Sequence, residues 1–504
     1  MDRTRQEPSP SPASTGPDET GYGIEAHGVD TIPEAERTGH PRDIVSVLVG
    51  NNLSLGVIIF GWLPVAFGLG FWDALTSTIV GSLIGTALVA PLTLTSLRSG
   101  TNQATASGAE FGVRGRLIGS ALGLVMSFGY AGLALWAAGD AVVAILDRMA
   151  GIPANGASYA VTYAVLAVPT CACAVFGYAW LVRLGRFLTV AMSIVLAIGV
   201  FAYAGDFSTA PTTDLALDTR WQTWILSTVL VGISGPMSYL TILGDYSRYI
   251  SPARHRPRAV VAATAAGMLV SLLIPTVFGT FTALAARAGT DDYIGPLVAA
   301  APGWFLIFLL ANAVLGTAGN SISVYSMGLD LDAILPRWSR LRSTVVCSII
   351  TTGLVYIGHF AWNAQDVITA LMVLLTATGT PWAVICLIGY VRSGGRYETE
   401  ALQVYNRRAT GGVYWYRAGW NPDAVIAWSA GSAVGLLAVD ADIMRGPLLH
   451  LTGDIDISFL LSGVVSGLLY VGLSARKPQP MATSEAHSAR HPDTSAQPPA
   501  GAAP

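Results

Sequence analysis

Charged residues are scarce in this sequence. Only 12% of its 504 residues are charged and 52% are apolar, whereas soluble domains carry about 25% charged residues. So few charges cannot cover the surface of a soluble protein of this length, and lipid is therefore the expected solvent. The net charge of −3 gives no basic surface for a nucleic-acid partner.

Cysteine and lysine are also rare. The four cysteines all lie within apolar stretches, which excludes a disulfide framework and a zinc site. They are Cys171, Cys173, Cys347 and Cys386. Lys477 is the single lysine among 28 basic residues, a bias typical of a GC-rich bacterial genome.

Apolar stretches fill the chain between two polar ends. A membrane helix needs about 20 residues, and twelve stretches reach or approach that length, which predicts an all-α integral membrane protein with twelve transmembrane helices. The predicted spans are residues 44–69, 73–96, 116–146, 159–181, 184–204, 222–243, 258–286, 303–328, 343–361, 366–391, 424–440 and 456–475.

Both ends are rich in Pro, Ser and other polar residues, so residues 1–43 and 476–504 are predicted to be disordered tails. Residues 1–43 lack the basic start and apolar core of a signal peptide. All but four of the 28 basic residues fall in the tails and in loops on one side of the predicted spans. The positive-inside rule therefore places both termini in the cytoplasm, with the protein in the plasma (inner) membrane.

Two of the predicted spans contain helix-breaking segments. The first holds VGNNLSLG, residues 49–56, and the sixth holds VGISGPMSYL, residues 231–240, where Pro236 removes a helix hydrogen bond. The two breaks lie five spans apart, as an inverted repeat of five helices requires, and broken helices often form transporter binding sites. Asn320 and Ser323 form a third polar patch because their spacing places them on one face of the eighth span.

Four motifs in this order resemble the nucleobase:cation symporter-1 family, the purine/cytosine permeases, over about residues 40–475. They are GNNLSLGVIIFG in the first span, RSGTNQATASGAEFGVRG before the third, GDYSRYISP at 244–252 and AGNSISVYSMGLDL at 318–331. The resemblance implies a leucine-transporter-like inverted repeat of five plus five helices, with helices 1 and 6 discontinuous.

The resemblance also divides the chain. Residues 44–391 would form the transport core, with repeats at about 44–204 and 222–391. A cytoplasmic loop over 392–423 and two accessory helices over 424–475 would follow.

The activity that the resemblance implies is import of a small planar heterocycle. Cytosine, a purine, uracil, allantoin or hydantoin would enter with Na+ or H+, without a cofactor; a monomer would suffice, and the oligomeric state stays open. The alternatives are an amino-acid or other small-solute carrier on the same fold and an integral membrane enzyme. The enzyme would need titratable groups or metal ligands at one depth, a pattern that the sequence does not show.

Matching the family's positions gives the expected binding residues. Tyr130 would stack on the heterocycle, Asn320 would bind its amide edge, and Ala134 stands where relatives can carry an amide. The aromatic of the sixth span aligns with Pro236 or Tyr239, and Tyr239 is preferred. The predicted substrate-binding residues are Asn51, Asn52, Ser54, Tyr130, Gly235, Ser238, Tyr239, Asn320 and Ser323.

The coupling ion is left open between Na+ and H+. In sodium-coupled relatives two hydroxyl residues upstream of the span-eight Asn coordinate Na+, and Val314 and Leu315 stand there in this sequence. Because hard cations prefer oxygen ligands, the replacement of the two hydroxyl residues favours proton coupling or a different arrangement of the Na+ site, with H+ slightly preferred. No Asp or Glu within the spans stands out as a proton carrier.

GDYSRYISPARHRPR, residues 244–258, lies at the predicted cytoplasmic exit of the sixth span. Asp245 and Arg248 are three residues apart and can pair on one helical face. Because the predicted spans place Asp245 near the cytoplasm, an inner gate or a structural anchor is favoured over a substrate site. Tyr246 and Tyr249 suit an interfacial aromatic belt.

Overall fold

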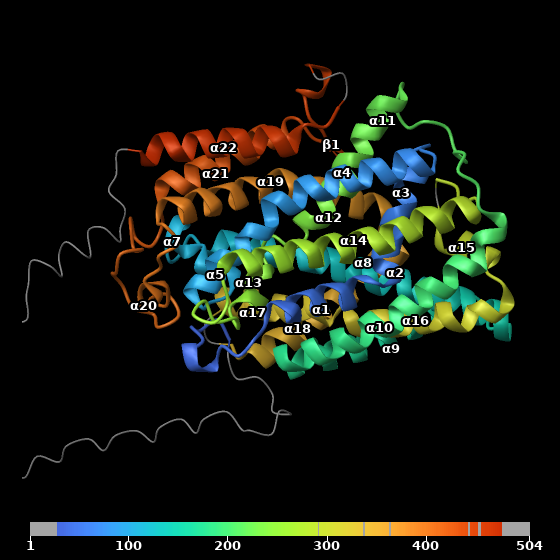
Figure 1. The fold of residues 1–504 in the computed structure, drawn as a ribbon, viewed down its shortest axis with the longest axis horizontal. Coiled ribbons are helices and arrows are strands. Elements are labelled where there is room, and N and C mark those ends of the chain that lie inside the picture. Colours follow the sequence, from blue (N-terminus) through green and yellow to red (C-terminus); the bar gives the residue numbers. More distant parts are fainter. Residues whose placement is uncertain are drawn as a thin grey trace, which may run out of the picture.

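The long helices lie roughly side by side in a computed structural model that describes residues 28–290, 292–335, 338–361, 364–441, 444–451 and 455–475 (Figure 1). Residues 1–27 and 476–504, predicted to be tails, lie outside the described residues. The longer helices are α4 (Phe71–Val89), α8 (Leu117–Ala150), α9 (Gly156–Phe176), α10 (Tyr178–Tyr203), α14 (Pro257–Ala285), α16 (Leu306–Gly319), α17 (Ser321–Ile334), α18 (Arg340–Ala361) and α19 (Ala364–Arg392).

Shorter elements complete the described chain. The helices are α1 (Pro41–Asn52), α2 (Leu55–Ile58), α3 (Trp62–Ala66), α5 (Thr93–Ser99), α6 (Gln103–Ala106), α7 (Gly108–Phe111), α11 (Arg220–Ser227), α12 (Ser234–Met237), α13 (Leu243–Ser247), α15 (Ile294–Ala300), α20 (Thr399–Leu402), α21 (Pro422–Leu436) and α22 (Ser458–Ser474). Two short strands, β1 (Asp440–Ala441) and β2 (Met444–Arg445), pair antiparallel.

Eight helical segments within the described residues are long and apolar enough to cross a membrane, or nine if the bent first span is counted. Near the C-terminus, α21 and α22 have only 15 and 17 residues. The twelve-span count therefore stays a prediction.

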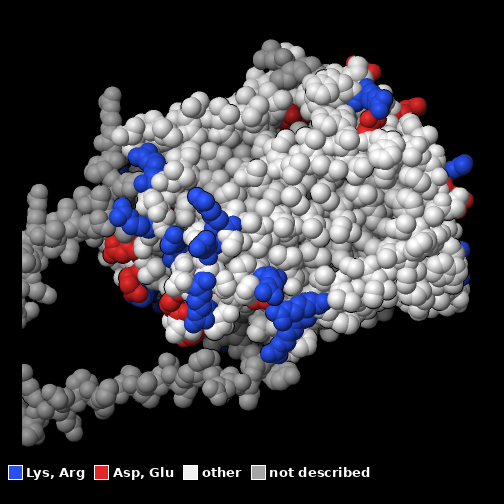
Figure 2. All heavy atoms as spheres, viewed as in Figure 1, with Lys and Arg blue, Asp and Glu red and all other residues white. Residues whose placement is uncertain are grey.

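Basic side chains gather at one end of the molecule. Figure 2 shows Lys and Arg concentrated at the left end and an uncharged band across the middle. We call this the basic end; α5, α13, α20 and the first and last described residues all lie there (Figure 1). Large apolar side chains such as Phe201 and Leu468 are 81% and 70% exposed, as expected for a lipid-facing surface.

The first predicted span is bent by 79° between α1 and the helix that starts at Leu55. The bend falls at Leu53 and Ser54, within the predicted break at 49–56. Asn52 ends α1, and the N–H of Leu53 still bonds to the carbonyl of Val49 at 3.3 Å. The bend turns backbone and side-chain polar groups toward the interior.

The sixth predicted span is interrupted twice. A π-helix over Thr228–Ile233 joins α11 to α12, and π-helical turns are frequent at functional sites. Residues 238–242 then form turns before α13 begins at Leu243. The unwound turns include Tyr239, at the edge of the predicted break at 231–240.

Spans one and seven pack backbone to backbone. A Cβ added at Gly61 would lie 1.9 Å from Thr276 O, and one added at Gly279 would lie 1.9 Å from Ile58 O. Small residues permit this close approach between membrane helices.

We expect Gly61→Ala to destabilise the protein by about 1–3 kcal/mol, because overpacking forces the backbones apart. Thermal unfolding of the detergent-purified protein measures the effect. Gly358→Ala on α18 is the matched control, since nothing lies within 4 Å of a Cβ there. Equal stability of the two variants would contradict the close packing of spans one and seven.

The prediction of a disordered tail over 1–43 is wrong for residues 28–43. Pro41 starts α1, and the side chains of Val29 and Ile32 are only 5% and 1% exposed. Composition alone missed this segment, because its partners come from distant parts of the chain. We call residues 28–40 the N-terminal strap.

The N-terminal strap connects three regions of the basic end. Its hydrogen bonds run from Ile32 N to Gly100 O at 3.0 Å, from Gly39 N to Tyr249 O at 2.9 Å and from Gln403 Nε2 to Val29 O at 3.2 Å. The strap therefore ties the end of α5, the segment after α13 and the region around α20 together.

Candidate functional site

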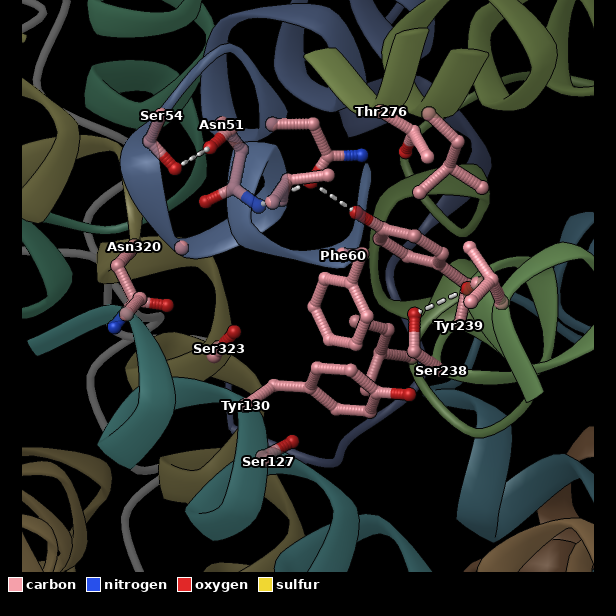
Figure 3. Close-up of a pocket in the computed structure, with 18 of the residues that line it drawn as sticks. Asn51, Ser54, Phe60, Ser127, Tyr130, Ser238, Tyr239, Thr276, Asn320 and Ser323 are labelled. Atoms are coloured by element: carbon pink, nitrogen blue, oxygen red, sulfur yellow. Dashed lines mark hydrogen bonds between the residues drawn. The ribbon is translucent and has the colours of Figure 1, made fainter. Parts of the chain in front are cut away.

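All nine predicted substrate-binding residues line one cavity of about 60 Å³ near the two helix breaks. Figure 3 shows Asn320 and Ser323 on one side, Ser238 and Tyr239 on the other, and the rings of Phe60 and Tyr130 between them. These residues come from α1 and the bend after it, α8, the unwound sixth span and α17. The cavity therefore lies where spans one, three, six and eight meet.

Asn52 and Tyr239 connect the two helix breaks directly. The hydroxyl of Tyr239 donates to Asn52 Oδ1 at 2.5 Å, and Asn52 Nδ2 donates to Ser271 Oγ on α14 at 2.9 Å. Asn51 Nδ2 also donates to Asn52 Oδ1, at 3.1 Å. The Asn52 amide is thus occupied by the protein itself, so its main contribution to the site is structural.

Two amide oxygens remain as acceptors at the cavity. Asn320 Nδ2 donates to the carbonyl of Ala131 on α8 at 3.1 Å, which turns Asn320 Oδ1 toward the cavity (Figure 3). Asn51 Oδ1 is buried and has no hydrogen-bond partner among the described residues. A bound molecule with N–H groups could satisfy both oxygens.

Two aromatic rings form an apolar surface within the cavity. The ring centroids of Phe60 and Tyr130 lie 6.1 Å apart with planes inclined at 39°. The Tyr130 hydroxyl donates to Ser234 O at 3.4 Å, which holds the ring beside the sixth span. A planar ring can stack on such a surface.

Several lining residues were missed from the sequence. Phe60 follows the break within the quoted motif GNNLSLGVIIFG, so an aromatic one or two turns beyond a break was the available signal. Ser82, Ser127 and Thr276 also line the cavity. They are single small polar residues on apolar helices, with no local signal that distinguishes them from packing residues.

The cavity also distinguishes between the two alignments of the sixth span. Tyr239 lines the cavity, whereas Pro236 faces α4, where a Cβ at Gly85 would meet it at 3.0 Å. Ala134 lines the cavity beside Gly56, and a Cβ at Gly56 would lie 2.6 Å from Ala134 Cβ. This tight contact leaves little room for a larger side chain at position 134.

The lining carries no charge. None of the described residues around the cavity is Asp, Glu, Lys, Arg or His. A buried ion without a partner is costly, so the cavity suits an uncharged molecule.

The positions matched to sodium ligands in the family do not offer oxygen side chains to the first span. Val314 is 40% exposed. Nearby, the buried Asn312 donates its Nδ2 to the carbonyl of Leu53 at 3.0 Å, at the bend itself. The Asn312 amide therefore occupies a backbone carbonyl at the bend of the first span.

Asp245 and Arg248 lie outside the cavity, at the basic end. Both are buried. Arg248 Nη1 donates to Gly28 O at 2.5 Å and Nη2 to the Tyr325 hydroxyl at 3.1 Å, so it links α13 to the N-terminal strap and α17. These contacts suit the predicted gate or anchor.

The prediction that Tyr246 lies in an interfacial belt is wrong. Tyr246 is fully buried and its hydroxyl lies 3.1 Å from Ser326 Oγ on α17. The neighbouring Tyr249 stacks on Tyr178 at 4.1 Å between ring centroids. Sequence periodicity could not show that α17 and α10 cover these rings.

Broken helices that meet at a cavity within a bundle of apolar helices are the arrangement in which membrane transporters often bind their substrates, and the fold is similar to that of solved transporters. The structure of Mhp1, a nucleobase-cation-symport-1 family transporter, in a closed conformation with bromovinylhydantoin bound matches with a TM-score of 0.67 and 16% identity, over 89% of this chain and 94% of that one. Mhp1 in an inward-facing conformation matches with a TM-score of 0.68 and 17% identity, over 92% of this chain and 96% of that one. A Na+-coupled sialic acid symporter in a substrate-bound, outward-open state matches with a TM-score of 0.56 and 13% identity, over 88% of this chain and 91% of that one.

Sequence comparison identifies the family. Residues 31–465 match the family described as permeases for cytosine/purines, uracil, thiamine and allantoin. YxlA of Bacillus subtilis (strain 168), which is named as a purine-cytosine permease, is 24% identical over 471 residues, 89% of this chain and 95% of that protein. This chain belongs to the nucleobase:cation symporter-1 family and is a transporter, not an enzyme.

Proposed function

We propose that this protein imports an uncharged nucleobase or related planar heterocycle together with a proton, across the cytoplasmic membrane of a bacterium. The observation that carries the proposal is the uncharged cavity, in which two amide oxygens and two aromatic rings converge. The oxygens of Asn51 and Asn320 would accept the N–H groups of a lactam or aminopyrimidine, while Tyr130 and Phe60 would contact the ring face.

The same lining argues against an amino-acid carrier, the alternative on this fold. An amino acid carries an ammonium and a carboxylate, and burial of both without charged partners is costly. The described lining offers no charged side chain to either group.

Proton coupling is supported by Asn312 and Val314, which leave the bend of the first span without the usual oxygen ligands for Na+. The basic end would face the cytoplasm by the positive-inside rule. Substrate would then enter from the opposite side and leave past α13 and the N-terminal strap.

Radiolabelled uptake tests the proposal in cells that lack their own permeases, with cytosine, adenine, hypoxanthine, uracil, allantoin and hydantoin as probes. We expect uptake of at least one, abolished by collapse of the proton gradient and unchanged when sodium is replaced by choline. Vector-only cells are the control. If correctly inserted protein takes up none of the six, the nucleobase proposal is wrong.

A further inference from the structure

A groove at the basic end is separate from the central cavity. Its volume is about 540 Å³, against about 60 Å³ for the central cavity. It lies where α7, the C-terminal ends of α19 and α22 and the N-terminal end of α21 meet, and these helices pack together at the left of Figure 1. None of the described residues that line the central cavity lines this groove, so the substrate site does not account for it.

Two arginines of the groove carry a positive charge that no described carboxylate neutralises. Arg392 ends α19, and its Nη2 donates to Ser474 O at 2.8 Å while its Nη1 donates to Ser474 Oγ. Both acceptors are uncharged, and a guanidinium has five N–H donors, so others remain. Arg417 is exposed, and its side chain forms no hydrogen bond or ion pair with a described residue.

The other charged residues of the groove leave its lining positive. Arg396 and Asp423 also line it, and their opposite charges cancel whatever their partners are. The remaining acid is Glu110 of α7. Three arginines therefore accompany at most two carboxylates, and the excess charge comes from Arg392 and Arg417. A positive lining at this size suits an anionic group.

Buried polar atoms of the groove also lack partners. Glu110 is 3% exposed, and its Oε2 has no hydrogen-bond partner among the described residues. Burial raises the pKa of Glu110 well above its usual range, so its carboxyl can donate a hydrogen bond. Tyr470 of α22 is 6% exposed, and its hydroxyl forms no bond with a described residue. Because an unpaired buried polar group is costly, the lining suits a bound molecule that supplies acceptors.

The groove opens toward the apolar surface of the helix bundle. Ile426 of α21 lines it and is 54% exposed, and Val391, which directly precedes Arg392, is 76% exposed. Exposed apolar side chains beside arginines at the ends of apolar helices are typical of the boundary between lipid and water. The positive-inside rule places this boundary on the cytoplasmic side. The groove therefore offers a charged part and an apolar part to one molecule.

The loop beside the groove has an unusual backbone. Tyr416 and Ala418 have φ angles of 41° and 52°, in the left-handed region that is costly for residues other than glycine. The Tyr416 hydroxyl donates to Ala109 O of α7 at 2.7 Å, which holds the loop against that helix. Arg417 lies between the two strained residues. Strain of this kind is often found where a protein holds a ligand.

We propose that this groove binds the head group of an anionic phospholipid of the cytoplasmic leaflet. The phosphate accepts hydrogen bonds from Arg392, Arg417 and the Tyr470 hydroxyl, and the acyl chains lie along Ile426 toward the membrane interior. Basic pockets between membrane helices on the cytoplasmic side bind such head groups. A free phosphate ion shares this chemistry, but it has no use for the exposed apolar side chains beside the arginines. The inference does not depend on the proposed import.

Native mass spectrometry of the full-length protein in detergent tests the site. Phosphatidylglycerol is the anionic probe and phosphatidylethanolamine the zwitterionic one. We expect the first phosphatidylglycerol to bind with a lower Kd than the first phosphatidylethanolamine. The double variant Arg392→Gln/Arg417→Gln should raise the Kd for phosphatidylglycerol about 25-fold, about fivefold for each arginine. Equal Kd values for the two lipids in the wild type would overturn the inference.

Arg256→Gln/Arg258→Gln is the matched control. Both arginines lie at the start of α14 and are exposed, and neither lines the groove. This variant loses the same charge from the cytoplasmic side, and we expect its Kd for phosphatidylglycerol to equal that of the wild type. Equal weakening by the two double variants would reveal a general effect of charge and would overturn the assignment of the groove.

Arg417→Gln alone keeps the test independent of folding. Arg392→Gln also removes the bonds to Ser474, whereas the Arg417 side chain forms no bond with a described residue. Arg417→Gln should melt at the wild-type temperature without added lipid and raise the Kd about fivefold; an unchanged Kd would contradict the inference. Inorganic phosphate at millimolar concentration should leave phosphatidylglycerol bound. Its displacement would identify a free-anion site and overturn the assignment to lipid.

Discussion

Asn320→Ala should reduce uptake about 5- to 150-fold at substrate concentrations below the wild-type KM. The substitution removes the amide oxygen that faces the cavity, held in place by the bond from Asn320 Nδ2 to Ala131 O at 3.1 Å. A buried N–H of the substrate left without its acceptor costs about 1–3 kcal/mol, or about 5- to 150-fold in affinity. Concentration-dependent uptake of the transported heterocycle measures the change.

The neighbouring residue provides the control for this variant. Ser321 is fully buried and does not line the cavity, so Ser321→Ala should leave the KM unchanged. Surface expression of both variants should match the wild type. Normal uptake by Asn320→Ala would remove Asn320 from the substrate site.

Tyr130→Ala should weaken substrate binding by about 1–3 kcal/mol, the range found when an aromatic that stacks on a base is removed. The reason is loss of the ring surface that Tyr130 forms with Phe60, whose ring centroid lies 6.1 Å away. Tyr130→Phe keeps that surface and loses only the 3.4 Å hydrogen bond to Ser234 O. The KM for uptake, compared among the wild type and the two variants, tests this.

The two Tyr130 variants separate the ring from the hydroxyl. We expect Tyr130→Phe to stay within about threefold of the wild type, because a long hydrogen bond contributes little. If Phe and Ala impair uptake equally, the hydroxyl and not the ring surface is what the substrate requires.

Local sequence features were sufficient to find much of the candidate site. Helix breaks can be recognised from a few adjacent residues, and helical spacing places Asn320 and Ser323 on one face. All nine predicted residues line a single cavity, although their roles in binding remain proposals. Lining the cavity is not the same as binding substrate. Asn52 lines the cavity, but its amide is already hydrogen-bonded to Tyr239 and Ser271.

Features that depend on distant partners could not be predicted. Asp330 lies within the quoted motif AGNSISVYSMGLDL, yet its burial depends on Gly123 of α8 and on Thr241 in the turns of the sixth span. The burial of Tyr246 depends likewise on α17. Helix periodicity shows which residues share a face, but only tertiary packing decides what that face meets.

The N-terminal strap has a consequence for the order in which the protein is built. Synthesis starts at the N-terminus, so the strap leaves the ribosome before any span. Its partners at Gly100, Tyr249 and Gln403 follow at intervals, and the last appears only after ten predicted spans. The earliest described segment can therefore complete its contacts only late, and the basic end can close only once nearly the whole chain has been made.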